Sequence, residues 1–325
     1  MKALVCREFA GIEALKVEEI ETPKPGPGQV RIRVRAAALN FPDKLIVEGR
    51  YQVKPPLPFV PGMELAGDVV ELGEAVDGFA PGDRVAAVVT WGALAQEAVV
   101  DADRVVHLPD ALSYERGAAF PLTYMTAWHG LVTRGGLKPA EKVVILGAAG
   151  GVGMAAIDIC RHIGAHAIAC ARGEEKLAFC SRMGAAETID YATQDLRAEL
   201  KARFGREGVD MVLDMVGGDL AEPAFRSLGH DGRHLVVGFA QGDIPRLPMN
   251  LALLNERRLI GVLWSDHASR NPGARQALGA KLAALIKEGA LSPHIDETGA
   301  LEETVRLLQT FRDRKVVGKQ VVVLP

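Results

Sequence analysis

The sequence lacks the features that identify several classes of protein. Its 325 residues include only four cysteines, and no two of them form a C-x-x-C pair, so zinc ribbons and dithiol redox motifs are excluded. Cys160, Cys170 and Cys180 follow one another at ten-residue intervals, but the expected alternation of strands and helices assigns them to different elements. We therefore expect all four, Cys6 included, to be reduced thiols of a cytoplasmic protein.

Charge and hydropathy exclude further classes. The formal net charge is −3 and no long block of like charge occurs, which argues against nucleic-acid and membrane-surface roles. No apolar run approaches the roughly 20 residues that cross a bilayer. The first residues, MKALVCREFAGIE, lack the apolar core of a secretory signal.

Residues 1–120 have the pattern of a mainly-β domain. Runs such as QVRIRVRAAAL and ELAGDVVEL are rich in strand-forming residues and are separated by turn clusters such as TPKPGPGQ and FAPGDR. Val30, Ile32 and Val34 alternate with arginines, which indicates a strand with one solvated face. We expect a compact antiparallel domain.

The pattern changes near residue 121. Short apolar strands such as KVVILG, HAIACA and VDMVLDMVG recur at spacings that leave room for helices. Helical periodicity is present in residues 152–164, 177–181, 196–204 and 220–228. This alternation predicts an α/β fold with a doubly wound parallel sheet, covered on both faces.

The C-terminal part contains two more helical patterns, over residues 278–286 and 301–311, and ends in the apolar strand KQVVVL. A strand this apolar needs a sheet to join, and we expect it to return to the first domain. That domain is then discontinuous, with residues 1–120 and 266–325 on either side of a second domain, residues 121–265.

The stretch GAAGGVG at 147–153 lies between a strand and a helical pattern, the context of a dinucleotide-binding turn. Free amides and the positive dipole end at the helix start suit a pyrophosphate. The residues expected to contact it are Gly150, Gly151, Val152 and Gly153. Gly153 also lets the helix lie close to the strand. Ala148 stands where the common G-x-G-x-x-G motif has its first glycine, and Gly147 eases the turn instead. The alternative is a tight turn without a ligand.

The end of the next strand distinguishes the two nicotinamide coenzymes. NAD sites usually carry an acidic residue about 20 residues after the turn, where it binds the ribose hydroxyls. This sequence has ACARGEEK there, and Arg172 and Lys176 suit a 2′-phosphate. Glu174 and Glu175 are interpreted as complements of a helix dipole. We therefore expect NADPH; a solvated helix face is the alternative interpretation of the two cations.

Five segments together resemble the zinc-free quinone oxidoreductases related to zeta-crystallin, a branch of the medium-chain dehydrogenase/reductase superfamily. These segments are ALNFPDKLIVEGRY (38–51), PFVPGMELAGDVVELGEAVDGFAPGDRVA (58–86), PLTYMTAWHGL (121–131), GAAGGVG (147–153) and GAAETIDY (184–191). The resemblance covers essentially the whole chain. It implies a GroES-like mainly-β catalytic domain, a Rossmann coenzyme-binding domain and a homodimer formed through the Rossmann domains.

The resemblance also assigns residues to the coenzyme. In this family a lysine and a tyrosine near the second and third Rossmann strands bind the 2′-phosphate, and Lys176 and Tyr191 match them. Arg314 is a candidate for an assisting arginine near the C-terminus. By their position in the expected fold, further coenzyme contacts are Thr126, ahead of the Rossmann strands, and Phe239 and Ala240, after the fifth strand.

The zinc alcohol dehydrogenases of this superfamily bind catalytic zinc through Cys, His and Cys. The matching positions here hold Asn40, Met63 and Ala118, none of which is a suitable zinc ligand, and the four-cysteine structural lobe is missing. We expect no metal. Without a Lewis acid, reduction of an electron-poor acceptor is easier than alcohol oxidation, because the acceptor itself delocalises the incoming hydride charge.

Hydride transfer to such an acceptor needs a donor for the developing negative charge. Asn40, which stands where a metal ligand would face the nicotinamide, and Tyr51, on the loop after it, are the candidates. The alternatives are a loop-capping amide and a partly buried structural aromatic. Asp43 and Glu64 are interpreted as an ordinary cap or turn residue and as the partner of an arginine.

The predicted function is NADPH-dependent reduction of a quinone or another electron-poor carbonyl compound. One alternative is an NADPH-dependent enoyl or alkenal double-bond reductase, acting on free or thioester substrates. Another is a non-catalytic NADPH-binding protein. The expected partners are a small-molecule acceptor and a second copy of the chain, not nucleic acid or a membrane.

Overall fold

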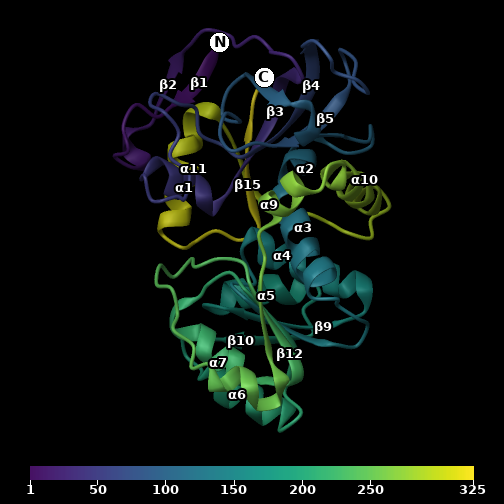
Figure 1. The fold of residues 1–325 in the computed structure, drawn as a ribbon. Coiled ribbons are helices and arrows are strands. Elements are labelled where there is room, and N and C mark those ends of the chain that lie inside the picture. Colours follow the sequence, from purple (N-terminus) through teal and green to yellow (C-terminus); the bar gives the residue numbers. More distant parts are fainter. The chain divides into compact units, whose positions relative to one another are not determined.

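The computed structural model describes all 325 residues, which divide into two compact units. Unit 1 comprises Met1–Leu122 and Ala268–Pro325, and unit 2 comprises Thr123–His267. In Figure 1 the purple N-terminal strands and the yellow C-terminal strand belong to the same unit. No helix is both long and apolar enough to pass through a bilayer.

Unit 2 is built on a six-stranded parallel sheet. Its strands are β8 (Lys142–Leu146), β9 (His166–Ala171), β10 (Glu187–Asp190), β11 (Val209–Asp214), β12 (Leu228–Val236) and β13 (Arg258–Gly261). They lie in the order β10-β9-β8-β11-β12-β13. The connections therefore reverse direction between β8 and β11, which is where open α/β sheets bind their ligands.

The helices of unit 2 cover its sheet. The main ones are α4 (Gly151–Ile163), α5 (Glu174–Arg182), α6 (Leu196–Phe204) and α7 (Ala221–Arg226). Val144, Ile168 and Val212, in three neighbouring strands, are fully buried, as is expected when both faces are covered. The helical segments predicted from periodicity are confirmed, and α6 has the predicted bounds.

Unit 1 contains a seven-stranded sheet, in the order β14-β15-β3-β4-β5-β7 with β6 also paired to β3, and a small β1-β2 sheet. The strands are β1 (Lys2–Val5), β2 (Lys16–Glu19), β3 (Gln29–Leu39), β4 (Glu64–Leu72), β5 (Arg84–Val88), β6 (Glu97–Asp101), β7 (Val105–His107), β14 (Ile295–Ala300) and β15 (Lys319–Val323). The C-terminal strand β15 lies antiparallel beside β3 (Figure 1).

One pair of strands departs from the expected antiparallel arrangement. β14 and β15 are parallel, and α11 (Thr304–Arg312) connects them. A parallel pair needs such a crossover, because a tight hairpin reverses the chain. The sequence pattern did not distinguish β14 as a strand, since IDETGA is polar and its alternate residues are exposed.

Several helices were not predicted. They are α1 (Phe41–Val47), α2 (Tyr114–Ala119), α3 (Pro121–Trp128), α8 (Asn250–Leu253) and α9 (Trp264–Arg270); α10 (Ala274–Lys287) occupies the expected tail segment. The unpredicted helices are too short to show helical periodicity. The predicted class is nevertheless confirmed, because a mainly-β unit accompanies a doubly wound parallel sheet.

All four cysteines are buried free thiols. Cys160, Cys170 and Cys180 lie on α4, β9 and α5, so their even spacing has no structural meaning, as predicted. Burial raises the pKa of the Cys160 thiol to about 12, which keeps it protonated and unreactive near neutral pH.

Candidate functional site

The glycine turn joins β8 to α4 at the reversal point of the unit 2 sheet. Gly147 has a φ of +74°, a left-handed conformation that favours glycine and that confirms its expected role in the turn. The amides of Gly147 and Ala148 both donate to the carbonyl of Cys170 at the end of β9, at 3.0 and 3.1 Å. The turn is therefore fixed against the neighbouring strand.

Gly150 and Gly153 differ in how much space the surrounding chain leaves for a side chain. A Cβ at Gly153 would lie 2.5 Å from the carbonyl oxygen of Gly147 and 2.6 Å from Ala148, so the close packing of helix on turn requires glycine. A Cβ at Gly150 would find its nearest atom at an ordinary 3.5 Å. Packing within the chain does not require glycine at 150, so the open space there is available to a ligand.

The start of α4 presents an anion-binding surface. Gly150 precedes the helix and accepts the amide of Met154 at 2.8 Å, the first bond of the helical ladder. The amides of Gly151, Val152 and Gly153 belong to the first turn, whose N–H groups have no acceptor within a helix. Together with the helix dipole, they suit a phosphate or diphosphate group.

The loops after β9 and β10 bring predicted residues together. The guanidinium carbon of Arg172 lies 5.4 Å from the centre of the Tyr191 ring. Lys176 lies in the first turns of α5, where it is half-buried, and Glu174 and Glu175 are exposed at the helix start. Two cationic side chains, Arg172 and Lys176, and the phenol of Tyr191 thus follow the ends of two neighbouring strands, β9 and β10.

Asp190, at the end of β10, organises these loops and was not singled out from the sequence. Its carboxylate accepts the amides of Gly173, at 3.2 Å, and Ala192, at 2.9 Å. Asp190 therefore fixes the backbone directly after Arg172 and directly after Tyr191. The signal was present in the stretch ETIDY, but the pairing of β9 with β10 is needed to interpret it.

A buried aspartate and histidine order the next loop along the sheet. Asp214, the last residue of β11, accepts the amides of Val216 and Gly217, both at 2.8 Å, through one carboxylate oxygen. Its other oxygen lies 3.1 Å from Nε2 of His234, which is 1% exposed on β12. Neither residue was predicted from the sequence, because only the parallel register of β11 and β12 makes them neighbours.

The remaining predicted contacts of unit 2 lie near this loop or on α3. Phe239 is 39% exposed, which is unusual for a large apolar side chain. The amide of Ala240 donates to the carbonyl of Met215 at 3.0 Å, so a backbone contact from Ala240 to a ligand would use its carbonyl. Thr126 lies half-buried on α3.

Unit 1 holds a closed group of buried side chains that we call the Asn40 cluster: Asn40, Glu64 and Lys319. Asn40 follows β3, Glu64 begins β4 and Lys319 begins β15, and the three strands are neighbours in the sheet. The Asn40 amide nitrogen donates to Glu64 Oε1 at 2.9 Å and to the carbonyl of Ala38 at 3.2 Å. Lys319 Nζ donates to Asn40 Oδ1 at 2.7 Å and also to Glu64.

Asp43 lies beside this cluster and acts as the predicted cap. Its carboxylate accepts the backbone amide of Asn40 at 2.7 Å at the start of α1. Complete burial raises the pKa of Asp43 to about 7, and its other oxygen has no hydrogen-bond partner. The interpretation of Glu64 was wrong in one respect, because its ionic partner is Lys319 rather than an arginine.

Tyr51 is half-buried and packs against the hydrophobic core of unit 1. Two of the three positions that hold zinc ligands in the zinc alcohol dehydrogenases are apolar here: Met63 belongs to this core and Ala118 is fully buried on α2. The third position is Asn40, whose amide is occupied as described. This donor set does not fit zinc, and no group of three histidine, cysteine, aspartate or glutamate side chains is placed to hold a metal. Arg314 is exposed between α11 and β15.

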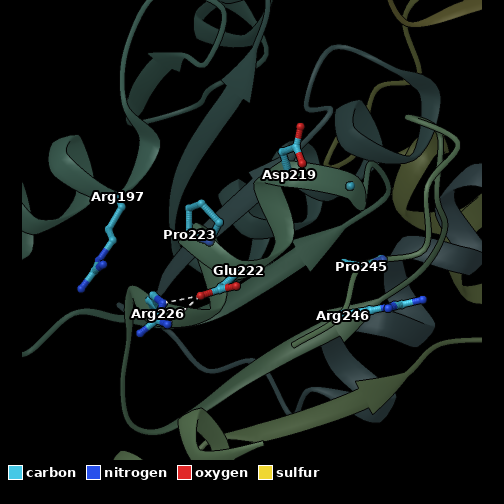
Figure 2. Close-up of a pocket in the computed structure, with 8 residues that line it drawn as sticks. Arg197, Asp219, Glu222, Pro223, Arg226, Pro245 and Arg246 are labelled. Carbon is cyan, nitrogen blue, oxygen red and sulfur yellow. Dashed lines mark hydrogen bonds and ion pairs between the residues drawn. The ribbon is translucent and has the colours of Figure 1, made fainter. Parts of the chain in front are cut away.

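An open pocket of about 380 Å³ lies on unit 2 between α6, α7 and the loop after β12 (Figure 2). Arg226 is bound to Glu222 at 2.6 Å, whereas Arg197 and Arg246 direct their guanidinium groups to opposite sides (Figure 2). Since the cations do not converge, the pocket has no evident anion site.

Comparison with known proteins gives consistent matches over the whole chain. Residues 26–110 match the alcohol dehydrogenase GroES-like domain, and residues 151–279 match the zinc-binding dehydrogenase domain. The chain is 36% identical to quinone oxidoreductase-like protein 2 of Bos taurus over 98% of this chain and 91% of that protein. It is 32% identical to the quinone oxidoreductase of Sus scrofa, over 100% and 98% of the two chains.

A solved structure shows the same fold. The Escherichia coli quinone oxidoreductase complexed with NADPH has a TM-score of 0.90 to this chain, with 25% sequence identity and complete coverage of both chains.

Proposed function

The chain belongs to the quinone oxidoreductase branch of the medium-chain dehydrogenase/reductase superfamily, and from this premise we propose that it reduces a quinone or another electron-poor carbonyl compound with NADPH and without zinc. The single observation that carries the proposal is the open space at Gly150, beside a helix start whose amides have no acceptor within the helix. An NADPH complex of a relative with the same fold supports the choice of coenzyme.

The residues of unit 2 fit each part of this coenzyme. We assign the diphosphate to Gly150–Gly153 and the 2′-phosphate to Arg172, Lys176 and Tyr191, with Arg314 as an additional candidate. Thr126, Phe239 and Ala240 are assigned to the remaining contacts. A carboxylate at the ribose position would repel a 2′-phosphate, and the nearby Asp190 is instead bound to backbone amides.

When bound, the coenzyme supplies the hydride. The acceptor gains this hydride and one proton from solvent, leaving as the hydroquinone or the corresponding reduced compound, while the coenzyme leaves oxidised. The chain's part is to place the acceptor and stabilise the negative charge that develops on its oxygen. Asn40 and Tyr51 are the proposed donors, and unit 1 contributes both.

Zinc is omitted from the proposed mechanism because of the residues present. Asn40, Met63 and Ala118 offer one amide, one thioether and no donor at all, which is not a zinc-binding set. Electron-poor acceptors do not need a Lewis acid, since they delocalise negative charge themselves. Alcohol oxidation is therefore not proposed.

A panel of acceptors tests the proposed function. Purified chain and NADPH are mixed with 1,4-benzoquinone, 9,10-phenanthrenequinone, an alkenal or crotonyl-CoA, and NADPH absorbance is followed. We expect the quinones to give the highest kcat/KM. Preference for the alkenal or the thioester would instead identify a double-bond reductase, and NADPH binding without any turnover would identify a non-catalytic binding protein.

We also propose that unit 2 forms a homodimer through β13. This strand is an edge of the sheet, so no other strand pairs with its outer side, and Leu259 on it is 55% exposed. Nearby in sequence, Leu253 and Leu263 are 80% and 52% exposed. Pairing with the same strand of a second copy would cover both the backbone and the leucines.

Light scattering coupled to size exclusion tests the dimer. We expect the mass of a dimer for the natural chain and of a monomer for Leu259→Lys. The control is Val53→Lys, at an exposed apolar position of unit 1, which should remain dimeric. A monomeric natural chain, or a dimeric Leu259→Lys variant, would contradict the proposal.

A further inference from the structure

Lys319 has no role in the motifs that identify the coenzyme site, yet it is among the most deeply buried charged residues of the chain, with 1% exposure. Its ammonium group donates to three acceptors: the carbonyl of Leu39 at 2.9 Å, Asn40 Oδ1 at 2.7 Å and the Glu64 carboxylate. An ammonium group has three donors, so all of them are used.

The sheet itself creates this arrangement. In the antiparallel pairing of β15 with β3, Gln320 faces Leu39, and in the pairing of β3 with β4, Ala38 faces Glu64. The ends of three adjacent strands thus meet at Asn40. Glu64 completes the arrangement through its second oxygen, which accepts the amide of Leu122 at 2.9 Å.

The contact with Lys319, together with the two acceptors Glu64 and Ala38, determines which way the Asn40 amide faces. An ammonium group can only donate, so it holds the amide oxygen and excludes the flipped arrangement. Of the two amide hydrogens, one is bound to Glu64 at 2.9 Å and the other to the Ala38 carbonyl at 3.2 Å. The longer bond is the weaker one, so that hydrogen is the one an acceptor oxygen could take over.

We propose that Lys319 is the positioning residue of Asn40: it helps to fix the orientation of the amide and polarises it, so that the N–H group bound to the Ala38 carbonyl can transfer its hydrogen bond to the acceptor oxygen. This inference rests on the proposed function, in which Asn40 stabilises charge on the acceptor. Lys319 itself touches neither the acceptor nor the coenzyme in this proposal.

The first test measures the amide directly and does not depend on activity. The chain contains four asparagines, at 40, 250, 255 and 271, and the last three are exposed. In chain labelled with 15N-asparagine, the Asn40 side-chain signal is the one missing from Asn40→Ala. We expect this signal to exchange with solvent at least tenfold faster in Lys319→Met than in the natural chain, while the other three are unchanged.

A double variant protects this test against misfolding. Lys319→Met leaves the Glu64 charge buried without its partner, which can destabilise the fold. The comparison is therefore repeated between the natural chain and Glu64→Gln/Lys319→Met, in which both buried charges are removed together. Equal exchange at Asn40 with and without Lys319, in folded chains, would overturn the proposal.

The second test connects the lysine to turnover through a double-mutant cycle. We expect Lys319→Met to lower kcat at least tenfold with an unchanged dissociation constant for NADPH, and Lys319→Arg to retain part of the activity. In the Asn40→Ala background, Lys319→Met should cause no further loss. If Lys319→Met lowered kcat equally in the natural and the Asn40→Ala backgrounds, Lys319 would have only a structural role.

Lys142→Met is the matched control, because Lys142 also begins a strand and is only partly buried, in unit 2. Its kcat should equal that of the natural chain. If the natural chain turns over no acceptor, the proposed function fails, and amide exchange at Asn40 still decides whether Lys319 holds the amide.

Discussion

The glycine turn of unit 2 and the Asn40 cluster of unit 1 use their polar groups in opposite ways. At the turn, first-turn amides have no acceptor in the helix, and a Cβ at Gly150 would meet only one atom within 4 Å. In the cluster, the amide of Asn40 is bound at all of its polar positions and Lys319 uses all three donors. The turn therefore has free groups for a ligand, whereas the cluster holds the side chain of Asn40 in one orientation.

The difference also predicts how each region tolerates change. A region with open space tolerates a small added group but loses its ligand, whereas a closed region loses stability or order when one member is altered. Four substitutions test this comparison.

The largest effect on stability is expected at Gly153, the closely packed glycine of the turn. Gly153→Ala places a methyl group 2.5 Å from a backbone oxygen, and we expect a loss of about 3 kcal/mol in the free energy of unfolding, the upper end for overpacking. Gly150→Ala, at the extended φ of −79°, should unfold within about 0.5 kcal/mol of the natural chain but bind NADPH at least tenfold more weakly. Denaturant unfolding and coenzyme titration measure both; similar stabilities for the two variants would contradict the distinction.

An intermediate effect is expected at Asp43, next to the cluster. Because burial raises its pKa from 3.8 to about 7, the unfolded chain releases this proton at lower pH than the folded chain. Asp43 therefore makes stability fall as pH rises from about 4 to 7, by roughly 1.4 kcal/mol per unit. Asp43→Asn removes this dependence.

Relative to the natural chain, Asp43→Asn should thus gain on the order of 2 kcal/mol in unfolding free energy between pH 5 and pH 7. Denaturant unfolding of both chains at these two pH values measures the gain. Glu71→Gln, on the partly solvated end of β4, is the control and should show no such gain. A stability difference that is constant with pH would mean that Asp43 is ionised throughout.

The smallest effect is expected at the edge of the coenzyme site. Lys176→Ala should weaken NADPH binding about tenfold, or about 1.4 kcal/mol, and leave NADH binding nearly unchanged, because only NADPH carries the 2′-phosphate. Lys201→Ala removes an exposed charge from α6 and should alter neither coenzyme. Equal losses of affinity for NADPH and NADH would mean that Lys176 does not contact the 2′-phosphate.

The two regions also differ in how far the sequence could predict them. The turn is local: strand, glycines and helix are consecutive in the chain, so Gly147, Gly153 and the bounds of α4 could be predicted closely. The Asn40 cluster joins residues 40, 64 and 319, and nothing in the sequence shows that β15 lies beside β3 at that register. Lys319 was therefore not recognised.

The same reason explains the other omissions. Asp214 and His234 meet only because β11 and β12 are parallel neighbours, and Asp190 fixes the loop after β9 only because β10 lies beside that strand. The fold class was predictable because it follows from periodicity and the order of elements. Site residues that depend on the register of distant strands were not.

The most direct test of the central claim combines turnover with metal content. The chain is dialysed against a chelator, its metal is measured by mass spectrometry, and quinone-dependent oxidation of NADPH is then followed. We predict full turnover at substoichiometric zinc and other transition metals. At an NADPH concentration that just saturates the natural chain, turnover should be lower in Gly150→Ala, because this variant binds NADPH more weakly. Turnover that disappears on chelation and returns with zinc would contradict the account.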